Sequence, residues 1–336
     1  MAVENGQVYW NIDSTEDVVS DRQDITSGLF SGEAGTLSSV FSSSTQTASS
    51  GQYYIDVYNV LPTSTTTTPE VQFAIAYGHK YGSGSLILNE QYPTRAIYSQ
   101  YKNILLEPTD EYFTIGSVNK AHIIAISFNL AQIKQTLDPG NWQIALSGST
   151  GKTYHLIDDS GQTITPTTGK SGRVFNIVSG TIAAGQYSTT TYYGLAYPDA
   201  GILILDPDQL SSGANVPCNN SASNTNAGNH YEFYHHMSQS MVAGNGFIAR
   251  NVENIASTHY FIRVKNAAFN FSNNPTFITG SLGDLYHESM IKNPTVYITS
   301  VGLYNNNLEL LAVAKLSQPL KKTFANEALI RVKLDY

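Results

Sequence analysis

The chain has few charged side chains and only one cysteine. Charged residues make up 13% of its 336 residues, whereas about a quarter is usual for a soluble domain. A single cysteine, Cys218, excludes an intrachain disulfide and suits folding in a reducing compartment. The formal net charge is -8, and the longest basic run is Lys321-Lys322. This balance excludes the clustered basic surface that nucleic acids require, so we expect no nucleic-acid partner.

Long apolar runs are also missing. One of the longest, residues 123–126, is far shorter than the ~20 residues that a membrane-spanning helix needs. Residues 1–6 have neither the basic nor the apolar region of a signal peptide, so secretion is not expected. The sequence therefore predicts no membrane partner.

Hydroxyl and amide side chains supply the polarity that charges do not. A hydroxyl that finds a hydrogen-bond partner is far cheaper to bury than an ion, so such a surface favours protein–protein contacts. Tyrosine is abundant, with 22 copies. It is typical both of β-strands and of interfaces, and the sequence leaves open how the copies divide between these two roles.

The last forty residues show the alternation that is typical of β-strands. Residues 296–304 alternate, residues 305–307 (Asn-Asn-Asn) form the expected turn, and a return strand is expected to begin at Leu308. Near the C-terminus, apolar and polar residues alternate, which predicts a half-buried strand. Its expected dry face consists of Ile330, Val332, Leu334 and Tyr336, and its wet face of Arg331, Lys333 and Asp335.

The same segment carries a resemblance. "NPTVYITSVGLYNNNLELLAVAKLSQPLKKTFANEALIRVKLDY" resembles the C-terminal part of virion structural proteins of large tailed bacteriophages, including those that infect cyanobacteria. "LDPGNWQIALSG", "YYGLAYPDAGILILD" and "THYFIRVKNAAFNFSNNPTF" resemble the same group, so the likeness covers roughly residues 70–336. "ITSVGLYNNNLELLAVA" is similar to a hairpin of phage tail-fibre attachment and baseplate proteins. The resemblance implies a particle component located in the host cytoplasm during assembly and then in the virion.

The expected fold is mainly β, with antiparallel, sandwich-like sheets, two or three short helices and an extended N-terminal arm. Residues 1–50 are the expected arm, because residues 38–50 are nearly all Ser, Thr, Ala and Gln. Such a segment either becomes ordered on a neighbouring subunit or forms a surface loop. Residues 51–215 and 216–336 are the two expected β-rich domains. Helices are expected from Pro93 onward, over 229–241, and over 130–137.

Several residue clusters have the composition of an enzyme site, but a structural role is the preferred interpretation of each. "GSTGKT" at 148–153 lacks the first glycine of a phosphate-binding loop, and a β-turn is expected there. The histidines of residues 230–236 lack the HExxH order of a zinc helix. The other candidates are Asp284, His287, Glu288 and Ser289, and the carboxylates Asp158, Asp159, Asp206 and Asp208, for which turn capping is expected. We therefore expect no catalytic residue, cofactor or metal.

These observations predict a structural protein of a tailed-phage virion and not an enzyme. The resemblance favours the tail or baseplate over the alternatives, the neck and the outer capsid. The expected partners are other virion proteins and copies of the chain itself. Its expected interface residues are Tyr9, Trp10, Tyr304, Leu308, Val332 and Tyr336. A different alternative is a receptor- or carbohydrate-binding module, in which exposed Trp10, Trp142 or tyrosine rings would stack on sugars.

Overall fold

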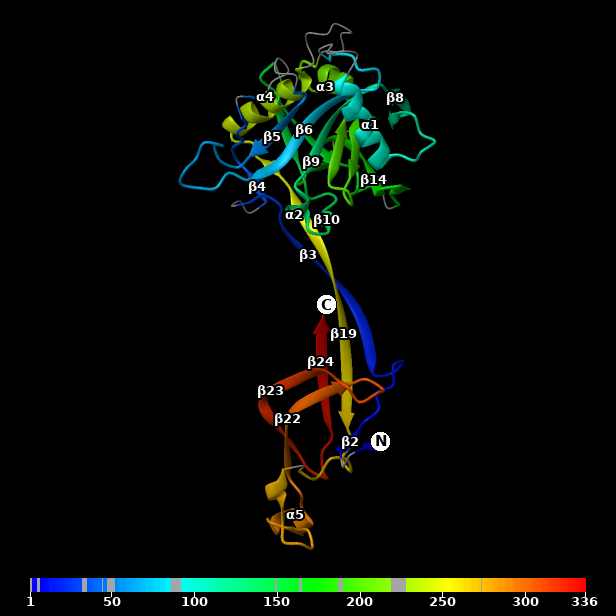
Figure 1. Ribbon diagram of the computed structural model, residues 1–336, viewed down its shortest axis with the longest axis vertical. Coiled ribbons are helices and arrows are strands. Elements are labelled where there is room, and N and C mark those ends of the chain that lie inside the picture. The colour runs from blue at the N-terminus through cyan, green and yellow to red at the C-terminus, as the bar shows by residue number, and fades with distance from the viewer. Residues whose placement is uncertain are drawn as a thin grey trace. The chain divides into compact units, whose positions relative to one another are not determined.

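The computed structural model describes residues 2–336 except 5–6, 32–34, 44, 47–51, 86–91, 149, 163–164, 187–189, 219–227 and 273. The chain forms two compact units (Figure 1). The terminal unit comprises Met1–Gln23 and Asn254–Tyr336, and the central unit comprises Asp24–Glu253. These boundaries fall within strands β3 (Val18–Gly28) and β19 (Arg250–Val264). The expected boundaries after residues 50 and 215 do not coincide with them.

The central unit is built on one curled antiparallel sheet (Figure 1). Its strand order is β11-β12-β14-β16-β17-β9-β6-β5, and the short strands β13 and β15 add to β14. In chain order these strands are β5 (Tyr54–Tyr58), β6 (Val71–His79), β9 (His122–Phe128), β11 (Ile144–Ser147), β12 (Thr153–Asp158), β13 (Thr167–Gly169), β14 (Gly172–Thr181), β15 (Gly185–Gln186), β16 (Tyr192–Tyr197) and β17 (Ile202–Leu205). Strands β9 and β17 are apolar at nearly every position, which is typical of strands that are buried on both faces.

Two helices cover the faces of this sheet. Helix α1 (Pro93–Leu105) begins with proline, whose fixed φ suits the first helical turn, and packs Tyr98, Tyr101 and Leu105 into one apolar cluster. Helix α4 (Asn229–Val242) places Phe233, Met237 and Met241 in the larger cluster. Both helices were expected from the sequence at these positions.

The remaining elements of the central unit are short. They are β4 (Thr36–Leu37), β7 (Phe113–Ile115), β8 (Val118–Lys120), α2 (Leu130–Ile133), β10 (Thr136–Leu137), α3 (Pro207–Gly213) and β18 (Phe247–Ile248). The expected class, mainly β with antiparallel sheets and few short helices, is confirmed. Within the described part of the chain, no helix is long and apolar enough to cross a bilayer.

The expected N-terminal arm is wrong for the described part of residues 29–40; residues 44 and 47–50 of the arm lie outside the described residues. Leu29, Phe30, Leu37 and Val40 are all buried in the main core of the central unit. The ring of Phe30 lies among three other phenylalanine rings, which come from β6, β9 and β18. Apolar side chains spaced along a Ser/Thr-rich segment are enough to anchor it, because each contributes its own burial energy.

The terminal unit contains the C-terminal strands. They are β22 (Val296–Tyr304), β23 (Leu310–Lys322) and β24 (Ala328–Asp335), and β24 pairs with β19 so that Val332 lies opposite Tyr260. Its other elements are β1 (Ala2–Glu4), β2 (Gln7–Tyr9), η2 (Pro275–Phe277), β20 (Ile278–Thr279), β21 (Asp284–Leu285) and α5 (Ser289–Lys292). The buried centre of this unit is small, with Leu303, Ile330 and Val332 as the buried members of its apolar cluster.

Two details of the expected C-terminal strands need correction. The return strand begins at Leu310 and not at Leu308, which has a positive φ of 62° and belongs to the turn. The side chain of Asn305 stabilises this turn by accepting hydrogen bonds from two backbone N–H groups. The expected dry face is correct for Ile330 and Val332 but wrong for Tyr336, which is 78% exposed.

Candidate functional site

The terminal unit exposes more large apolar side chains than it buries. Its buried apolar residues are Val264, Ala268, Leu303, Ala328, Ile330 and Val332. Its exposed ones are Val19, Phe271, Ile278, Leu282, Tyr286, Ile291, Tyr297, Tyr304, Leu310, Leu311, Val313, Phe324, Leu329 and Tyr336. The central unit shows the opposite balance. Exposed apolar side chains that gather in one region are typical of a surface that another protein covers.

The hairpin of β22 and β23 is apolar on both of its faces. Val301, Ala312 and Ala314 point inward, toward the small core. On the other side, Leu311 is 67% exposed and Val313 is 63% exposed. Val313 lies opposite Gly302, and the ring of Tyr304 covers this glycine. We call Tyr304, Leu311 and Val313 the outer hairpin face. Strands with two apolar faces are normally buried on both.

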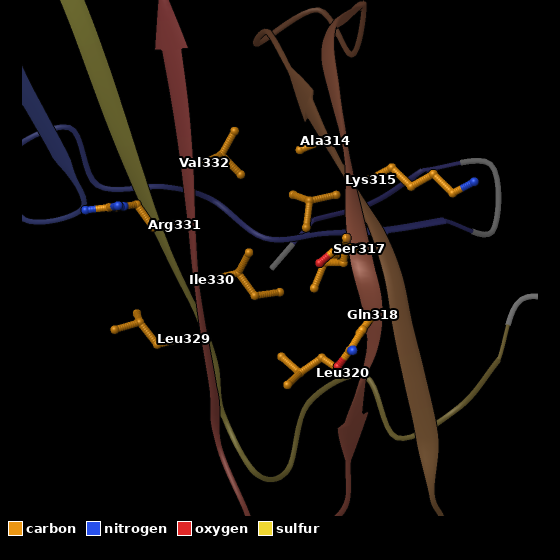
Figure 2. Close-up of a pocket in the computed structure, with 11 residues that line it drawn as sticks. Ala314, Lys315, Ser317, Gln318, Leu320, Leu329, Ile330, Arg331 and Val332 are labelled. Atoms are coloured by element: carbon orange, nitrogen blue, oxygen red, sulfur yellow. The ribbon is translucent and has the colours of Figure 1, made fainter.

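A bulge opens a cavity between the hairpin and β24. Ile298 lies opposite Leu320, while Ser300 lies opposite Lys315, so four residues of β23 have no regular partner on β22. One of them is proline, which cannot donate a hydrogen bond to a neighbouring strand. The adjacent cavity has a volume of about 430 Å³. Figure 2 shows Ile330 and Val332 pointing from β24 toward β23, whereas Leu329 and Arg331 point away. The hollow is partly open to solvent, and it lies beside the buried residues Ile330 and Val332.

Strand β24 lies at the edge of its sheet. It pairs with β19 along one side, and no strand in the described ranges pairs with its other side. An edge strand offers backbone donors and acceptors to a further strand. Its exposed side chains include Arg331 and Lys333, and such charges limit unspecific pairing of a strand edge.

The six expected interface residues all belong to the terminal unit. The rings of Tyr9 and Tyr304 pack edge to face, with their centroids 5.2 Å apart. Trp10 is partly buried, with the ammonium of Lys265 lying 5.7 Å from its ring centroid. Tyr304 and Tyr336 are exposed, and Leu308 is partly exposed in the turn. Val332 needs correction: it is 5% exposed, so its side chain serves the core of the unit and is not available to a partner.

The sugar-stacking alternative loses one of its two tryptophans. Trp142 is 1% exposed in the main core, where its indole N–H donates a hydrogen bond to the carboxylate of Asp158. A sugar cannot stack on a ring that is buried in this way.

The nucleotide-like motifs have structural roles. The glycine-containing segment 148–153 connects β11 to β12, and its turn is closed by hydrogen bonds from the N–H groups of Gly148 and Gly151. Ser149 lies outside the described residues. The apolar run that ends at Asp206 is strand β17, and the carboxylate of Asp206 caps helix α3 by accepting a hydrogen bond from the Asp208 N–H.

The histidines of α4 do not converge. His236 is buried and its Nδ1 contacts the backbone oxygen of Ser147, whereas the Nε2 atom of His235 lies 2.9 Å from the Gln239 amide nitrogen. His230 is fully buried. Each of these three histidines therefore has its own packing environment on the helix.

The other acidic candidates also lie in structural or exposed positions. Asp158 accepts hydrogen bonds from the N–H groups of Gly140 and Ser160, and burial raises the pKa of its carboxyl group. Asp159 accepts two hydrogen bonds from Asn176. The bond from Ser160 to Asp158 caps a turn, as expected, whereas the Asp159 carboxylate binds Asn176 of β14, seventeen residues away. Asp284, His287, Glu288 and Ser289 are all exposed.

One polar cluster in the central unit is not predicted by the sequence. Lys120 and His122 flank the start of β9, and Asp206 and Asp208 flank the start of α3. The two segments meet because Leu205 of β17 lies opposite Ile124 of β9. The Lys120 ammonium lies 2.7 Å from Asp206 Oδ2 and 3.7 Å from Asp208 Oδ2.

A second histidine lies beside this cluster. The rings of His79 and His122 are 6.0 Å apart, and His79 Nδ1 accepts hydrogen bonds from the N–H groups of Tyr81 and Ser83. Burial, together with the neighbouring His122, lowers the pKa of His79 to about 4. Burial and the nearby carboxylates raise the pKa of the Cys218 thiol to about 12, which disfavours the reactive thiolate at neutral pH.

The signal that the sequence offers is the short separation of Lys120 and His122, which lie at the end of β8 and at the start of β9. It does not reveal which distant strand lies alongside. Comparison with known proteins adds no further guidance: no family model matches the chain, and neither a curated protein nor a solved structure matches it.

Proposed function

We propose that this chain is a structural protein of a tailed-phage virion and that it assembles through its terminal unit. The observation that carries the assembly proposal is the outer hairpin face, where Leu311 and Val313 are exposed on a hairpin whose other face is already packed. The assignment to a phage particle, with the tail or baseplate preferred to the neck or outer capsid, rests on the sequence resemblance of residues 70–336.

Energetics favour a covered hairpin. Apolar surface contributes about 25 cal/mol for each Å² that is removed from water. A stable interface buries more than about 1,000 Å² in total. The apolar cluster of the terminal unit has few buried members, so the unit gains little stability from its own packing. Burial of the outer hairpin face against another copy of the chain would supply stability that the isolated unit lacks.

Sedimentation velocity of the purified full chain tests the assembly proposal. We expect a defined oligomer at micromolar concentration. A double variant, Leu311→Asp with Val313→Asp, should shift the chain to monomer, because charges cannot be buried in an apolar contact. The matched control carries the same substitutions at Leu61 and Leu130, which are exposed in the central unit, and should remain oligomeric.

A wild-type chain that stays monomeric at every concentration would contradict the self-assembly of copies through the outer hairpin face. The particle assignment has its own test. Gold-labelled antibodies raised against the chain should mark the tails of phage particles from lysates of the host. Labelling of the capsid would move the protein to that position, and unlabelled particles would contradict the virion proposal.

A further inference from the structure

The polar cluster of the central unit has the features of a metal site. Ligand atoms from His122, Asp206 and Asp208 all lie within 4.8 Å of one another. Nε2 of His122 is 3.0 Å from Oδ1 of Asp208. One imidazole nitrogen and two carboxylate oxygens form a mixed ligand set that suits zinc and similar divalent transition metals better than magnesium or calcium, which prefer oxygen alone.

The state of His122 is an independent indication of a missing ligand. Its side chain is 2% exposed, yet neither ring nitrogen has a partner with hydrogen-bond geometry in the described ranges. The short distance to Asp208 therefore brings the two atoms together without the alignment of a hydrogen bond. A buried polar group whose hydrogen bonds are not made is destabilising, so such groups are rare and call for an explanation.

We propose that His122, Asp206 and Asp208 bind one divalent metal ion of the zinc class. In the absence of metal, the ammonium of Lys120 holds the two carboxylates together and offsets part of their repulsion. A metal ion brings two positive charges to the position where Lys120 brings one. Lys120 retains 14% side-chain exposure, which leaves its charged end a path toward solvent when the metal enters.

The geometry requires only a small contraction. Ligand atoms around a tetrahedral zinc ion with bonds of about 2.1 Å lie about 3.4 Å apart. Asp208 is 45% exposed at its side chain, so it can rotate toward the other two ligands. Asp206 is held in place as the cap of α3, and its Oδ2 faces the cluster. The metal site belongs to the central unit and the outer hairpin face to the terminal unit, so the metal proposal and the assembly proposal can each fail without the other.

Calorimetric titration of the metal-free full chain with zinc chloride tests this proposal. The titrations use a Cys218→Ser background, so that the thiol cannot act as a competing zinc ligand. We expect one zinc ion per chain with a micromolar or lower Kd. His122→Gln should weaken binding at least tenfold, and Asp208→Asn should also weaken it.

Replacement of Lys120 should change the zinc affinity in the opposite direction. Lys120→Met should tighten zinc binding, because the metal then no longer competes with an internal ammonium for the carboxylates. The matched control is His287→Gln, an exposed histidine beside Glu288 in the terminal unit, which should leave the affinity unchanged. If His122→Gln fails to fold, the exposed Asp208→Asn variant decides. A wild-type chain that binds no zinc, or variants that bind it as the wild type does, would show that the cluster is only an ion-pair network.

Discussion

Replacement of Phe30 by alanine tests whether the second half of the expected arm belongs to the folded core. Phe30 is 3% exposed, and its ring centroid lies 5.2 Å from that of Phe247 and 6.2 Å from that of Phe73. Truncation of a buried phenylalanine costs about 3–5 kcal/mol, because it removes apolar burial and leaves a cavity. Native domains are stable by only about 5–15 kcal/mol, so this loss would be a large fraction of the total.

Urea unfolding followed by tryptophan fluorescence measures this effect. A Trp10→Phe background leaves Trp142, at the core of the central unit, as the single reporter. With a slope of about 3 kcal/mol per molar urea, Phe30→Ala should lower the midpoint by about 1 M or more. The control Phe324→Ala changes a side chain that is 52% exposed and should leave the midpoint nearly unchanged. Equal midpoints for the two variants would refute the placement of Phe30 in the core.

Three further predictions concern other parts of the chain. Val332→Asp should unfold the terminal unit, because it buries a charge at a cost of several kcal/mol. Leu329→Asp, on the exposed side of β24, should be tolerated. Limited proteolysis should therefore cut residues 254–336 faster in the Val332→Asp variant than in the Leu329→Asp variant. Gly194→Ala should prevent folding of the central unit, because the new Cβ would lie 2.0 Å from a backbone oxygen of β17. Gly161→Ala, whose new Cβ would have no atom within 4 Å, should have the melting temperature of the wild type. His79 is neutral in the folded state down to about pH 4 but protonates near 6.5 when unfolded, so stability is fully present above pH 6.5 and falls as the pH drops to 4. His79→Gln should flatten this dependence, and an unchanged slope would contradict it.

Local patterns were sufficient to predict several elements. Alternating residues predicted β22 and β24, because one side of each strand packs on the small core. Proline at the start of α1 and apolar residues at helical spacing predicted the two long helices. Asparagines after β22 predicted the turn but not its last residue, since Leu308 adopts a positive φ that is unusual for leucine.

Long-range packing could not be predicted in this way. The Ser/Thr-rich composition of residues 38–50 suggested an arm, but Leu29, Phe30 and Leu37, which precede it, enter the main core. The polar cluster depends on the register between β9 and β17, which are separated by more than seventy residues and were not expected to be neighbours. Val332 was expected both at an interface and on a dry face, and only the packing of β23 shows that the core takes it.

Cysteine labelling at position 313 tests the central claim most directly. Val313→Cys places a thiol on the outer hairpin face, and Leu61→Cys places one at an exposed site in the central unit. The raised pKa of Cys218 keeps its own reaction with a maleimide slow. At high protein concentration, other copies should cover the outer hairpin face, so the thiol of the Val313→Cys variant should react at least tenfold more slowly than that of the Leu61→Cys variant. This protection should disappear when the protein is diluted. Equal rates at all concentrations would show that the outer hairpin face stays open to solvent and would contradict the account.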